Sequence, residues 1–290
     1  MATRPTVLLD ESNVSTPLTP PSPSSSRRIP TASRSPARAW PARSGRREGE
    51  VRGLEAAAAA APAVTPIELF YDRIADEFDR IMNRYDLQRR LETVYEDLLG
   101  PCDLRGRSLL DAGCGTGWFS LWAHQRGADV TAVDIGPRLL AQVRRKCPAR
   151  IVLGDVLDLQ FADGSFDVVV SSECIEHTRD PRRAVHEVIR VCRPGGLVVI
   201  TSNNRRWWWL CNLANRLHLR PYEGIENWPS WRQLRMWVEE TGATVLDMRG
   251  IHLFPFQIAM FHPLLRFLDR WGRGLGPLCV NQAVLATKTL

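Results

Sequence analysis

The sequence predicts an α/β fold in which helices cover both faces of a mainly parallel sheet. From residue 107 onward, short apolar runs alternate with stretches of helical periodicity, the order typical of strand–helix–strand units. The apolar runs contain few polar interruptions, as expected of strands that are buried on both faces. Five of these strands are expected at 107–113, 129–135, 150–155, 166–172 and 196–202, and two later ones at 243–251 and 278–288.

Helices are predicted between these strands and ahead of them. In 65–100, apolar side chains recur every three or four residues, which is the helical period. Thr65, Pro66 and Glu68 have the order of an N-cap, a first helical residue and a capping-box acid. One or two amphipathic helices should therefore begin there and end at Gly100. Further helices are predicted at 117–127, 136–147, 180–196 and 230–242.

The positive charge of the chain is concentrated in its first quarter. The formal charge is +6, and residues 1–65 hold nine arginines against five acidic residues. The rest of the chain is nearly balanced, which argues against a nucleic-acid-binding protein. The segment 1–62 is rich in Pro, Ser and Arg and poor in large apolar side chains, so it is predicted to be disordered. A mitochondrial transit peptide has a similar composition and is the alternative for this segment.

The cysteines and the apolar segments indicate where the protein is found. Seven cysteines without a C-x-x-C pair indicate reduced thiols and a cytoplasmic protein. No apolar run reaches membrane-spanning length. Two segments, 203–222 and 251–271, combine aromatic residues with arginines and are candidates for contact with a membrane surface. The competing interpretation of both is a lid over a substrate pocket.

The segment 109–120 combines a strand, a glycine-rich loop and the start of a helix. Gly113, Gly115 and Gly117 permit a tight turn and a close approach of the backbone to a ligand. A dinucleotide-binding fingerprint has its third glycine one position later, where this chain has Trp118. The loop therefore favours a nucleotide-like ligand and argues against the alternative of a nicotinamide-dependent oxidoreductase.

Two aspartates follow at the ends of the next two predicted strands. Asp134 stands about twenty residues after the glycine loop, where a carboxylate can accept both hydroxyls of a ribose. Asp155 ends the following strand and is suited to an adenine amino group. Strand-end aspartates are also common turn residues, but these two lie in register with the glycine loop. An adenosine-containing ligand is therefore expected across the carboxyl edge of the sheet.

These segments, together with 154–181 and 188–205, closely resemble the class I S-adenosylmethionine-dependent methyltransferases. The resemblance implies a Rossmann-like, doubly wound sheet of seven strands with a reversed last strand, and S-adenosylmethionine as the cofactor. It implies that Asp134 binds the ribose, that Asp155 lies near the adenine, and that Asp111 orients the sulfonium side. The other cofactor-binding positions that it implies are Gly113, Cys114, Gly115, Gly117, Ile135, Val156 and Ser172.

The segment 171–181 follows the fourth predicted strand and holds Glu173, Glu176 and His177. On a helix these three side chains would share one face and could bind Mg²⁺ or another divalent metal. The spacing resembles ubiquinone-biosynthesis O-methyltransferases and small-RNA 3′-end methyltransferases, in which this motif binds a divalent metal. The former group has a histidine in a later loop where this chain has Glu226, which puts a further ligand in doubt.

Two other roles of this segment stay open. Without a metal, His177 could act as general base beside Glu176, and the acceptor atom could then be carbon or nitrogen. Alternatively, the three residues could be structural, with the acids placed favourably in the first turn of a helix.

The sequence thus predicts a methyltransferase domain over 65–290, with a helical cap at 65–100 and a substrate lid at 203–275. We expect transfer of a methyl group to an oxygen of a small aromatic or lipid-like acceptor. A protein that binds the cofactor without catalysis is the alternative from another class.

Overall fold

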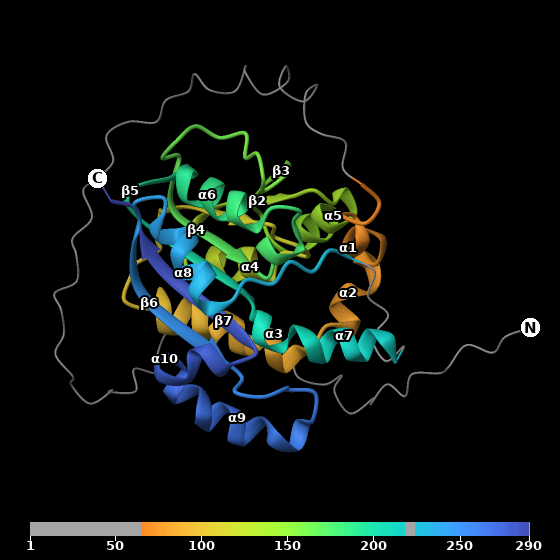
Figure 1. Ribbon diagram of the computed structural model, residues 1–290. Coiled ribbons are helices and arrows are strands. Elements are labelled where there is room, and N and C mark those ends of the chain that lie inside the picture. The colour runs from red at the N-terminus through yellow and green to blue at the C-terminus, as the bar shows by residue number, and fades with distance from the viewer. Residues whose placement is uncertain (1–64, 218–223, 290) are drawn as a thin grey trace, which may run out of the picture. The chain divides into compact units, whose positions relative to one another are not determined.

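A seven-stranded sheet forms the centre of the part of the chain that the computed structural model describes, residues 65–217 and 224–289 (Figure 1). Its strand order is β3-β2-β1-β4-β5-β7-β6. All neighbours pair in parallel except β7, which runs antiparallel to both β5 and β6. The predicted doubly wound sheet with a reversed last strand is therefore confirmed. The strands are β1 (Ser108–Ala112), β2 (Asp129–Asp134), β3 (Arg150–Leu153), β4 (Phe166–Ser172), β5 (Cys192–Asn203), β6 (Thr244–Ile251) and β7 (Asn281–Thr287).

The central strands are buried on both faces, as their unbroken apolar runs predict. Val168, Val169 and Val170 of β4 have no exposed surface, and Leu109 and Leu110 of β1 are equally buried. Each such side chain contributes about 1.5–3 kcal/mol of hydrophobic stabilisation. The core therefore fixes the positions of the strand ends from which the site is built.

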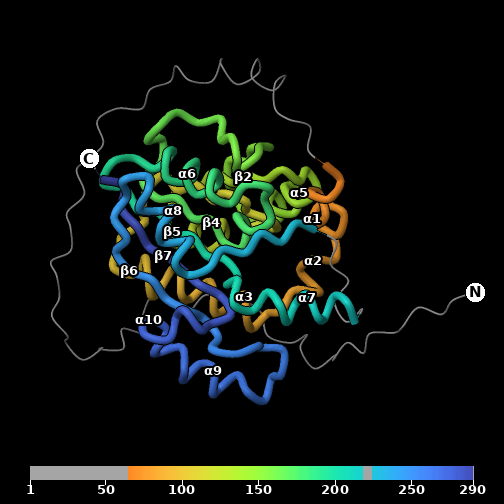
Figure 2. Tube along the Cα trace, viewed as in Figure 1, coloured from red at the N-terminus to blue at the C-terminus, as the bar shows by residue number. Residues whose placement is uncertain are grey.

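Helices cover both faces of the sheet, as Figures 1 and 2 show. On one face, α4 (Trp118–Gln125) packs against β1 and β2, and α5 (Pro137–Lys146) packs against β2 and β3. On the other face, α6 (Pro181–Val191) contacts β4 and β5, while α8 (Trp231–Glu239) contacts β6, β7 and α6. All four helices lie within the predicted ranges. The capping box of α8, formed by Ser230 and Gln233, was not predicted.

The predicted N-terminal helix is divided into shorter ones. These are α1 (Phe70–Arg73), α2 (Ala75–Ile81), α3 (Arg84–Glu92) and a π-helical turn, η4 (Thr93–Leu98). The expected start at Thr65 is wrong, because residues 65–69 form turns and the first helix begins at Phe70. The carboxylate of Glu68 accepts hydrogen bonds from both the Thr65 amide and its hydroxyl, so only half of the capping box forms.

Short helices follow the later strands. After β4 comes η5 (Ile175–His177), and after β5 come η6 (Arg205–Trp207) and α7 (Trp208–Arg216). Between β6 and β7 the chain forms five short helices in succession. They are η7 (Ala259–Phe261), α9 (His262–Leu268), η8 (Asp269–Trp271), α10 (Gly272–Leu275) and η9 (Gly276–Leu278).

Two predictions concern residues that the structure describes only in part or not at all. The disordered tail predicted for 1–62 lies outside the described residues, and so does the end of the 203–222 segment, from residue 218 onward. Among the helices of residues 65–217 and 224–289, none is both long enough and apolar enough to cross a membrane.

Candidate active site

The predicted cofactor-binding residues lie together at the carboxyl ends of the first four strands. Asp111 of β1 is in register with Ala132 of β2 and with Val170 of β4. Asp134 of β2 pairs with Leu153 at the end of β3, two residues before Asp155. The sequence therefore folds so that the glycine loop, the three aspartates and the end of β4 share one edge. Ile135, Val156 and Ser172 follow or end strands at the same edge.

The glycine loop between β1 and α4 requires its glycines for two different reasons. Gly113, Gly115 and Gly117 all have positive φ angles, of 74°, 53° and 89°. A Cβ on Gly113 would lie 2.1 Å from the sulfur of Cys174. Any side chain at position 113 would therefore collide with the segment after β4. A Cβ on Gly115 would meet nothing within 4 Å. The backbone at Gly115 is therefore free to approach a ligand, as the cofactor requires.

Asp134 and Asp111 bring two buried carboxyl groups to this edge. Asp134 accepts hydrogen bonds from the amides of Gly115 and Gly136, each at 2.9 Å, which fixes the loop to the end of β2. Burial raises the pKa of Asp134 to about 6. Asp111 accepts a hydrogen bond from the Ser120 hydroxyl at 2.6 Å, and burial raises its pKa to about 7. A cationic ligand at this edge would favour the ionised forms of both groups.

We expect Asp111→Asn to stabilise the protein without cofactor at pH 8 and to remove part of its pH dependence. Since the pKa of Asp111 is about 7 in the fold and about 3.9 when unfolded, the folded state binds the additional proton. The wild type should therefore lose stability as the pH rises from about 4 to 7, by about 4 kcal/mol from this group. Urea unfolding at pH 4.5 and pH 8 measures the difference. Equal pH dependence in both proteins would contradict the assignment.

The N-terminal helices are fastened to the glycine loop and to α5. Asp79 of α2 accepts hydrogen bonds from the Thr116 hydroxyl at 2.6 Å and from the Trp118 indole at 3.0 Å. Asp72 of α1 accepts from the amides of Arg138 and Leu139 and so caps the first turn of α5. Neither aspartate was predicted from the sequence. Their spacing of seven residues places both on the same face of a helix, and this was the one feature of the sequence that could have indicated a shared role.

Two further contacts connect the N-terminal segment to the ends of β3 and β4. Arg179 binds Glu68 at 2.8 Å and Asp155 at 3.3 Å. The hydroxyl of Tyr71 lies 3.2 Å from Nε2 of His177. The helical cap predicted for 65–100 therefore touches the segments that follow β1, β2, β3 and β4, which are the segments that carry the predicted cofactor residues.

The three candidate metal ligands after β4 do not share a helical face. Glu173 has a left-handed backbone conformation, with φ at 50°, and only Ile175–His177 form a helical turn. The carboxylate of Glu173 accepts hydrogen bonds from the Thr201 hydroxyl at 3.0 Å and the Asn281 amide at 3.1 Å. Glu176 is completely buried, and its Oε1 accepts from the backbone amide of Asn203 at 2.8 Å. The helical arrangement expected from the spacing is therefore wrong.

His177 is held by two neighbours from other parts of the chain, Tyr71 and Ile225. Its Nδ1 lies 2.9 Å from the carbonyl oxygen of Ile225, so Nδ1 carries the proton and donates. Its Nε2 then accepts from the Tyr71 hydroxyl. Within the described residues no group of three or more His, Cys, Asp or Glu is arranged to hold a metal ion. The donor set does not fit the metal that its spacing suggested.

The remaining candidate positions have simple local partners. The Ser172 hydroxyl lies 2.8 Å from that of Thr201 on the neighbouring strand. Cys114 is buried and its amide donates to the carbonyl of Val133. Glu226 follows Ile225 and lines a cavity of about 420 Å³ together with Arg179 and Trp208.

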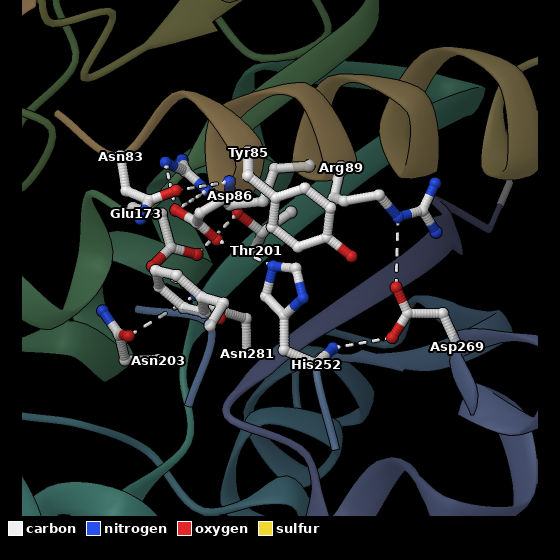
Figure 3. Close-up of polar contacts among 12 residues, drawn as sticks. Asn83, Tyr85, Asp86, Arg89, Glu173, Thr201, Asn203, His252, Asp269 and Asn281 are labelled. Atoms are coloured by element: carbon white, nitrogen blue, oxygen red, sulfur yellow. Dashed lines mark hydrogen bonds and ion pairs between the residues drawn. The ribbon is translucent and has the colours of Figure 1, made fainter. Parts of the chain in front are cut away.

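A buried polar network beyond β4 was not predicted (Figure 3). Arg90 of α3 forms an ion pair with Asp86 at 2.8 Å, and Asp86 also lies 3.2 Å from Nε2 of His252. Burial raises the pKa of both Glu173 and Glu176, and the charge of Glu173 raises that of Glu176 further. In the sequence, only the four-residue spacing of Asp86 and Arg90 on a helix could have pointed to this network.

The sheet with one reversed strand, the glycine loop after β1 and the acids at the ends of β1 and β2 and after β3 define a class I S-adenosylmethionine-dependent methyltransferase. A family model described as a methyltransferase domain matches residues 110–200. The malonyl-[acyl-carrier protein] O-methyltransferase of Salmonella typhimurium is 30% identical over 197 residues, which cover 61% of this chain and 78% of that protein. The chain belongs to the class I S-adenosylmethionine-dependent methyltransferase family.

Other relatives differ in how much of their length is matched. The malonyl-[acyl-carrier protein] O-methyltransferase of Serratia marcescens is 38% identical over 129 residues, which cover 43% of this chain. The match spans 51% of that protein, about half of its length. The demethylmenaquinone methyltransferase of Renibacterium salmoninarum is 28% identical over 210 residues, which cover 62% of this chain and 88% of that protein.

Solved structures agree with the fold. A Haloferax volcanii methyltransferase in complex with its Trm112 activator superposes with a TM-score of 0.57 at 17% identity, over 76% of this chain and 98% of that one. An S-adenosylmethionine-dependent methyltransferase from Thermotoga maritima gives 0.56 at 18% identity, over the same shares of the two chains. The [4+2]-cyclase SpnF also gives 0.56 at 18% identity, covering 79% of this chain and 98% of that one. The fold is thus shared by proteins of different chemistry.

Proposed function

We propose that this methyltransferase methylates a hydroxyl oxygen of a small aromatic or lipid-like acceptor without a resident metal ion. The observation that carries the proposal is the setting of His177 at the end of β4. Its Nδ1 is fixed by the Ile225 carbonyl, so its Nε2 presents a lone pair to a hydroxyl, which in this structure is that of Tyr71. This is the arrangement that a general base for an O–H group requires.

The residues at the sheet edge fit S-adenosylmethionine. We assign Asp134 to the ribose hydroxyls, Asp155 to the adenine and Asp111 to the sulfonium side. The open approach at Gly115 supports the assignment, and Gly113, Gly117, Cys114, Ile135, Val156 and Ser172 complete the proposed cofactor site. When bound, S-adenosylmethionine supplies a methyl group on a positively charged sulfur, which leaves as a neutral thioether.

The proposed reaction needs one proton transfer to the protein. An acceptor hydroxyl that takes the place of the Tyr71 hydroxyl would donate its hydrogen bond to Nε2 of His177. As the acceptor oxygen forms its bond to the methyl carbon, the electron pair of the carbon–sulfur bond goes to sulfur and the hydroxyl proton goes to Nε2. The Ile225 carbonyl keeps the ring oriented through Nδ1 while the charge develops. The enzyme contributes mainly by holding the oxygen in line with the methyl group.

The relatives define which acceptors should be tested. Proteins similar to this chain are named for malonyl-[acyl-carrier protein] and for demethylmenaquinone. Radiolabelled S-adenosylmethionine should therefore be incubated with a malonyl thioester, a short-chain demethylmenaquinone and catechol. We expect transfer to a hydroxylated acceptor, and the same rate with and without EDTA. If EDTA stops methyl transfer and Mg²⁺ restores it, the metal-free proposal is contradicted. If only carbon or nitrogen atoms are methylated, the alternative acceptor atoms are favoured over oxygen.

A lipid-like acceptor is supported by exposed apolar side chains on two late segments. In α7, Trp209 is 59% exposed, and between β6 and β7 Met260 is 77% exposed. Arg205 and Arg206 stand exposed just before α7. Apolar side chains beside arginines are typical of peripheral contact with an anionic membrane.

We expect the protein to sediment with vesicles that contain anionic lipid. The double substitution Trp209→Ser and Met260→Ser should reduce the bound fraction, because it removes apolar surface that would enter the bilayer interface. The exposed surface substitution Leu246→Ser, on β6, is the control. Equal sedimentation of all three proteins, or no sedimentation of the wild type, would contradict membrane contact.

A further inference from the structure

The ends of β4, β5, β7 and β6 form a second half of the sheet edge, beside the half that carries the cofactor residues. The amide of Glu173 donates to the carbonyl of Thr201 near the end of β5. Asn203 of β5 is in register with Asn281, the first residue of β7, and Asn281 is in register with Ile251 of β6. Because β7 is reversed, its start rather than its end lies here. The chain thus aligns four polar residues along this edge, Glu173, Asn203, Asn281 and His252.

Three buried polar atoms at this edge have no hydrogen-bond partner within the described part of the chain. They are Oε2 of Glu176, Oδ1 of Asn281 and Nδ1 of His252. The three residues are 0%, 1% and 0% exposed. Buried polar atoms are almost always hydrogen-bonded in folded proteins, because an unsatisfied one costs free energy. Three of them along one sheet edge indicate a site that a polar ligand completes.

The backbone is strained at the same place. Among the described residues other than glycine, only Glu173 and His252 have positive φ angles, of 50° and 59°. A positive φ is uncommon for any residue other than glycine, although histidine adopts it more often than glutamate, and such strain concentrates at ligand-binding sites. Figure 3 shows the His252 ring directed toward Asp86, with Glu173, Asn203 and Asn281 lying to one side of it.

Aromatic rings form one wall of this site. The ring centroids of Tyr85 and Phe256 lie 5.3 Å and 4.6 Å from that of His252. Tyr85 in turn stacks on His262 of α9, with centroids 3.7 Å apart and planes within 4°. A ligand held here would therefore contact flat apolar surfaces as well as the unpaired polar atoms, which suits a ring that carries polar groups.

The hydrogen-bonding state of His252 defines the chemistry of the ligand. The carboxylate of Asp86, which also pairs with Arg90, can only accept, so Nε2 of His252 carries the proton. In the singly protonated ring Nδ1 is then an acceptor, as Oδ1 of Asn281 always is. Each of these two atoms can accept a hydrogen bond from a donor on the ligand. A carboxylate ligand offers none, and it would be repelled by Asp86 and Glu173 while Arg90 is already engaged by Asp86.

We propose that the edge formed by His252, Asn281 and Glu176 binds a neutral hydroxyl group of the methyl acceptor, which donates its one proton to Nδ1 of His252 or to Oδ1 of Asn281, and so selects hydroxylated rings over carboxylates. This inference rests on the proposed function, because it places the acceptor beside the cofactor. His252 acts here as a binding residue, and Asp86 as the residue that positions its ring. The proton acceptor in the reaction is still His177, at the end of β4.

The test is a titration of the complex with S-adenosylhomocysteine by catechol and, separately, by benzoate. We expect saturable binding of catechol and much weaker binding of benzoate, which has no donor and carries a negative charge. His252→Asn should weaken catechol binding roughly tenfold, because asparagine tolerates the left-handed backbone but lacks the ring nitrogen. Asn281→Ala should weaken it to a similar extent. The affinity for S-adenosylhomocysteine should stay unchanged in both.

His186→Asn is the matched control. His186 lies on α6, where its Nε2 is 3.6 Å from Oε2 of Glu240, so it is a histidine outside the sheet edge that holds His252. Its substitution should change no affinity. A melting temperature of His252→Asn that equals or exceeds that of the wild type would agree with a binding role. Replacing a histidine that only supports the fold would instead lower the melting temperature.

The outcomes separate this inference from the proposed function. Tighter binding of benzoate than of catechol, no saturable binding of catechol at millimolar concentrations, or unchanged catechol binding in both variants would each overturn the inference. None of these results bears on whether the wild type transfers a methyl group to oxygen. The converse result is also possible. If catechol binds and His252→Asn weakens that binding, but no hydroxylated acceptor is methylated, the proposed function is wrong and the proposed binding site is still supported.

Discussion

Replacing Arg90 by methionine is expected to lower the free energy of unfolding by about 3–5 kcal/mol at neutral pH. Arg90 lies in α3, is 8% exposed and pairs with Asp86 at 2.8 Å. It also lies close enough to Glu173 and Glu176 for their charges to raise its own pKa. Methionine would keep the apolar stem of the side chain but leave buried carboxylates without a counter-charge. Breaking a buried pair from one side is among the most costly single substitutions.

The loss in the free energy of unfolding caused by Arg90→Met should become smaller as the pH falls. Burial would raise the pKa of Asp86, but the charge of Arg90 and the hydrogen bond from His252 outweigh it and hold the pKa below its usual value. In the wild type this contribution to stability is present above the unfolded pKa and is lost as the pH falls through the folded one. Without Arg90 the pKa of Asp86 in the folded state rises. Protonation of Asp86 at acidic pH then removes the unpaired buried charge, so the variant is destabilised less.

Urea unfolding of wild type and Arg90→Met at pH 7.5 and pH 4.5 measures both effects. The control is Arg105→Met, because Arg105 pairs with Asp103 at the surface, where the two side chains are 80% and 61% exposed. We expect that control to change stability by less than about 0.5 kcal/mol. A similar small loss in both variants would show that the buried pair contributes no more than a surface pair.

Replacing His177 by alanine is expected to lower kcat by about 10²–10⁴-fold once an acceptor is known. The ring is the group whose Nε2 faces a hydroxyl at the end of β4, and its removal leaves no positioned base there. The affinity for S-adenosylhomocysteine should not change, because His177 is not among the residues that we assign to the cofactor. Tyr71→Phe should have a smaller effect, since it removes only the hydroxyl that the acceptor would replace.

Single-turnover rates with bound cofactor distinguish this role from a structural one. The circular dichroism spectrum and melting temperature of His177→Ala should resemble those of the wild type within a few degrees. His186→Ala, on the surface of α6, is the control and should react at the wild-type rate. A rate for His177→Ala within about threefold of the wild type would exclude a general-base role.

The sheet, its helices and the cofactor edge could be predicted from the sequence because their signals are local. Apolar runs such as 166–172 identify a buried strand without knowledge of its neighbours. The glycine loop and Asp134 are separated by one helix, and the βα order fixes that both reach the same edge. The reversed β7 followed from the resemblance rather than from periodicity, and the order of the strands was not predicted.

The acceptor side could not be predicted because its contacts join distant parts of the chain. His252 and Asp86 are 166 positions apart, and neither belongs to a recognisable motif. The spacing of Glu173, Glu176 and His177 was misleading for a similar reason. Helical spacing places side chains together only where the backbone is helical, and here Glu173 is held in a left-handed conformation between Thr201 and Asn281.

The reversal of β7 also determines which end of the molecule can be modified safely. Since β7 starts at the ligand edge and runs the other way, its last residue, Thr287, pairs with Leu197, where β5 enters the sheet. The backbone then leaves beside Gly195, whose amide donates to the carbonyl of Lys288. A purification tag or fluorescent partner fused behind this strand would therefore emerge on the side opposite to the ligands. A position behind Lys288 is therefore the preferred attachment point for the binding and turnover experiments proposed for this protein.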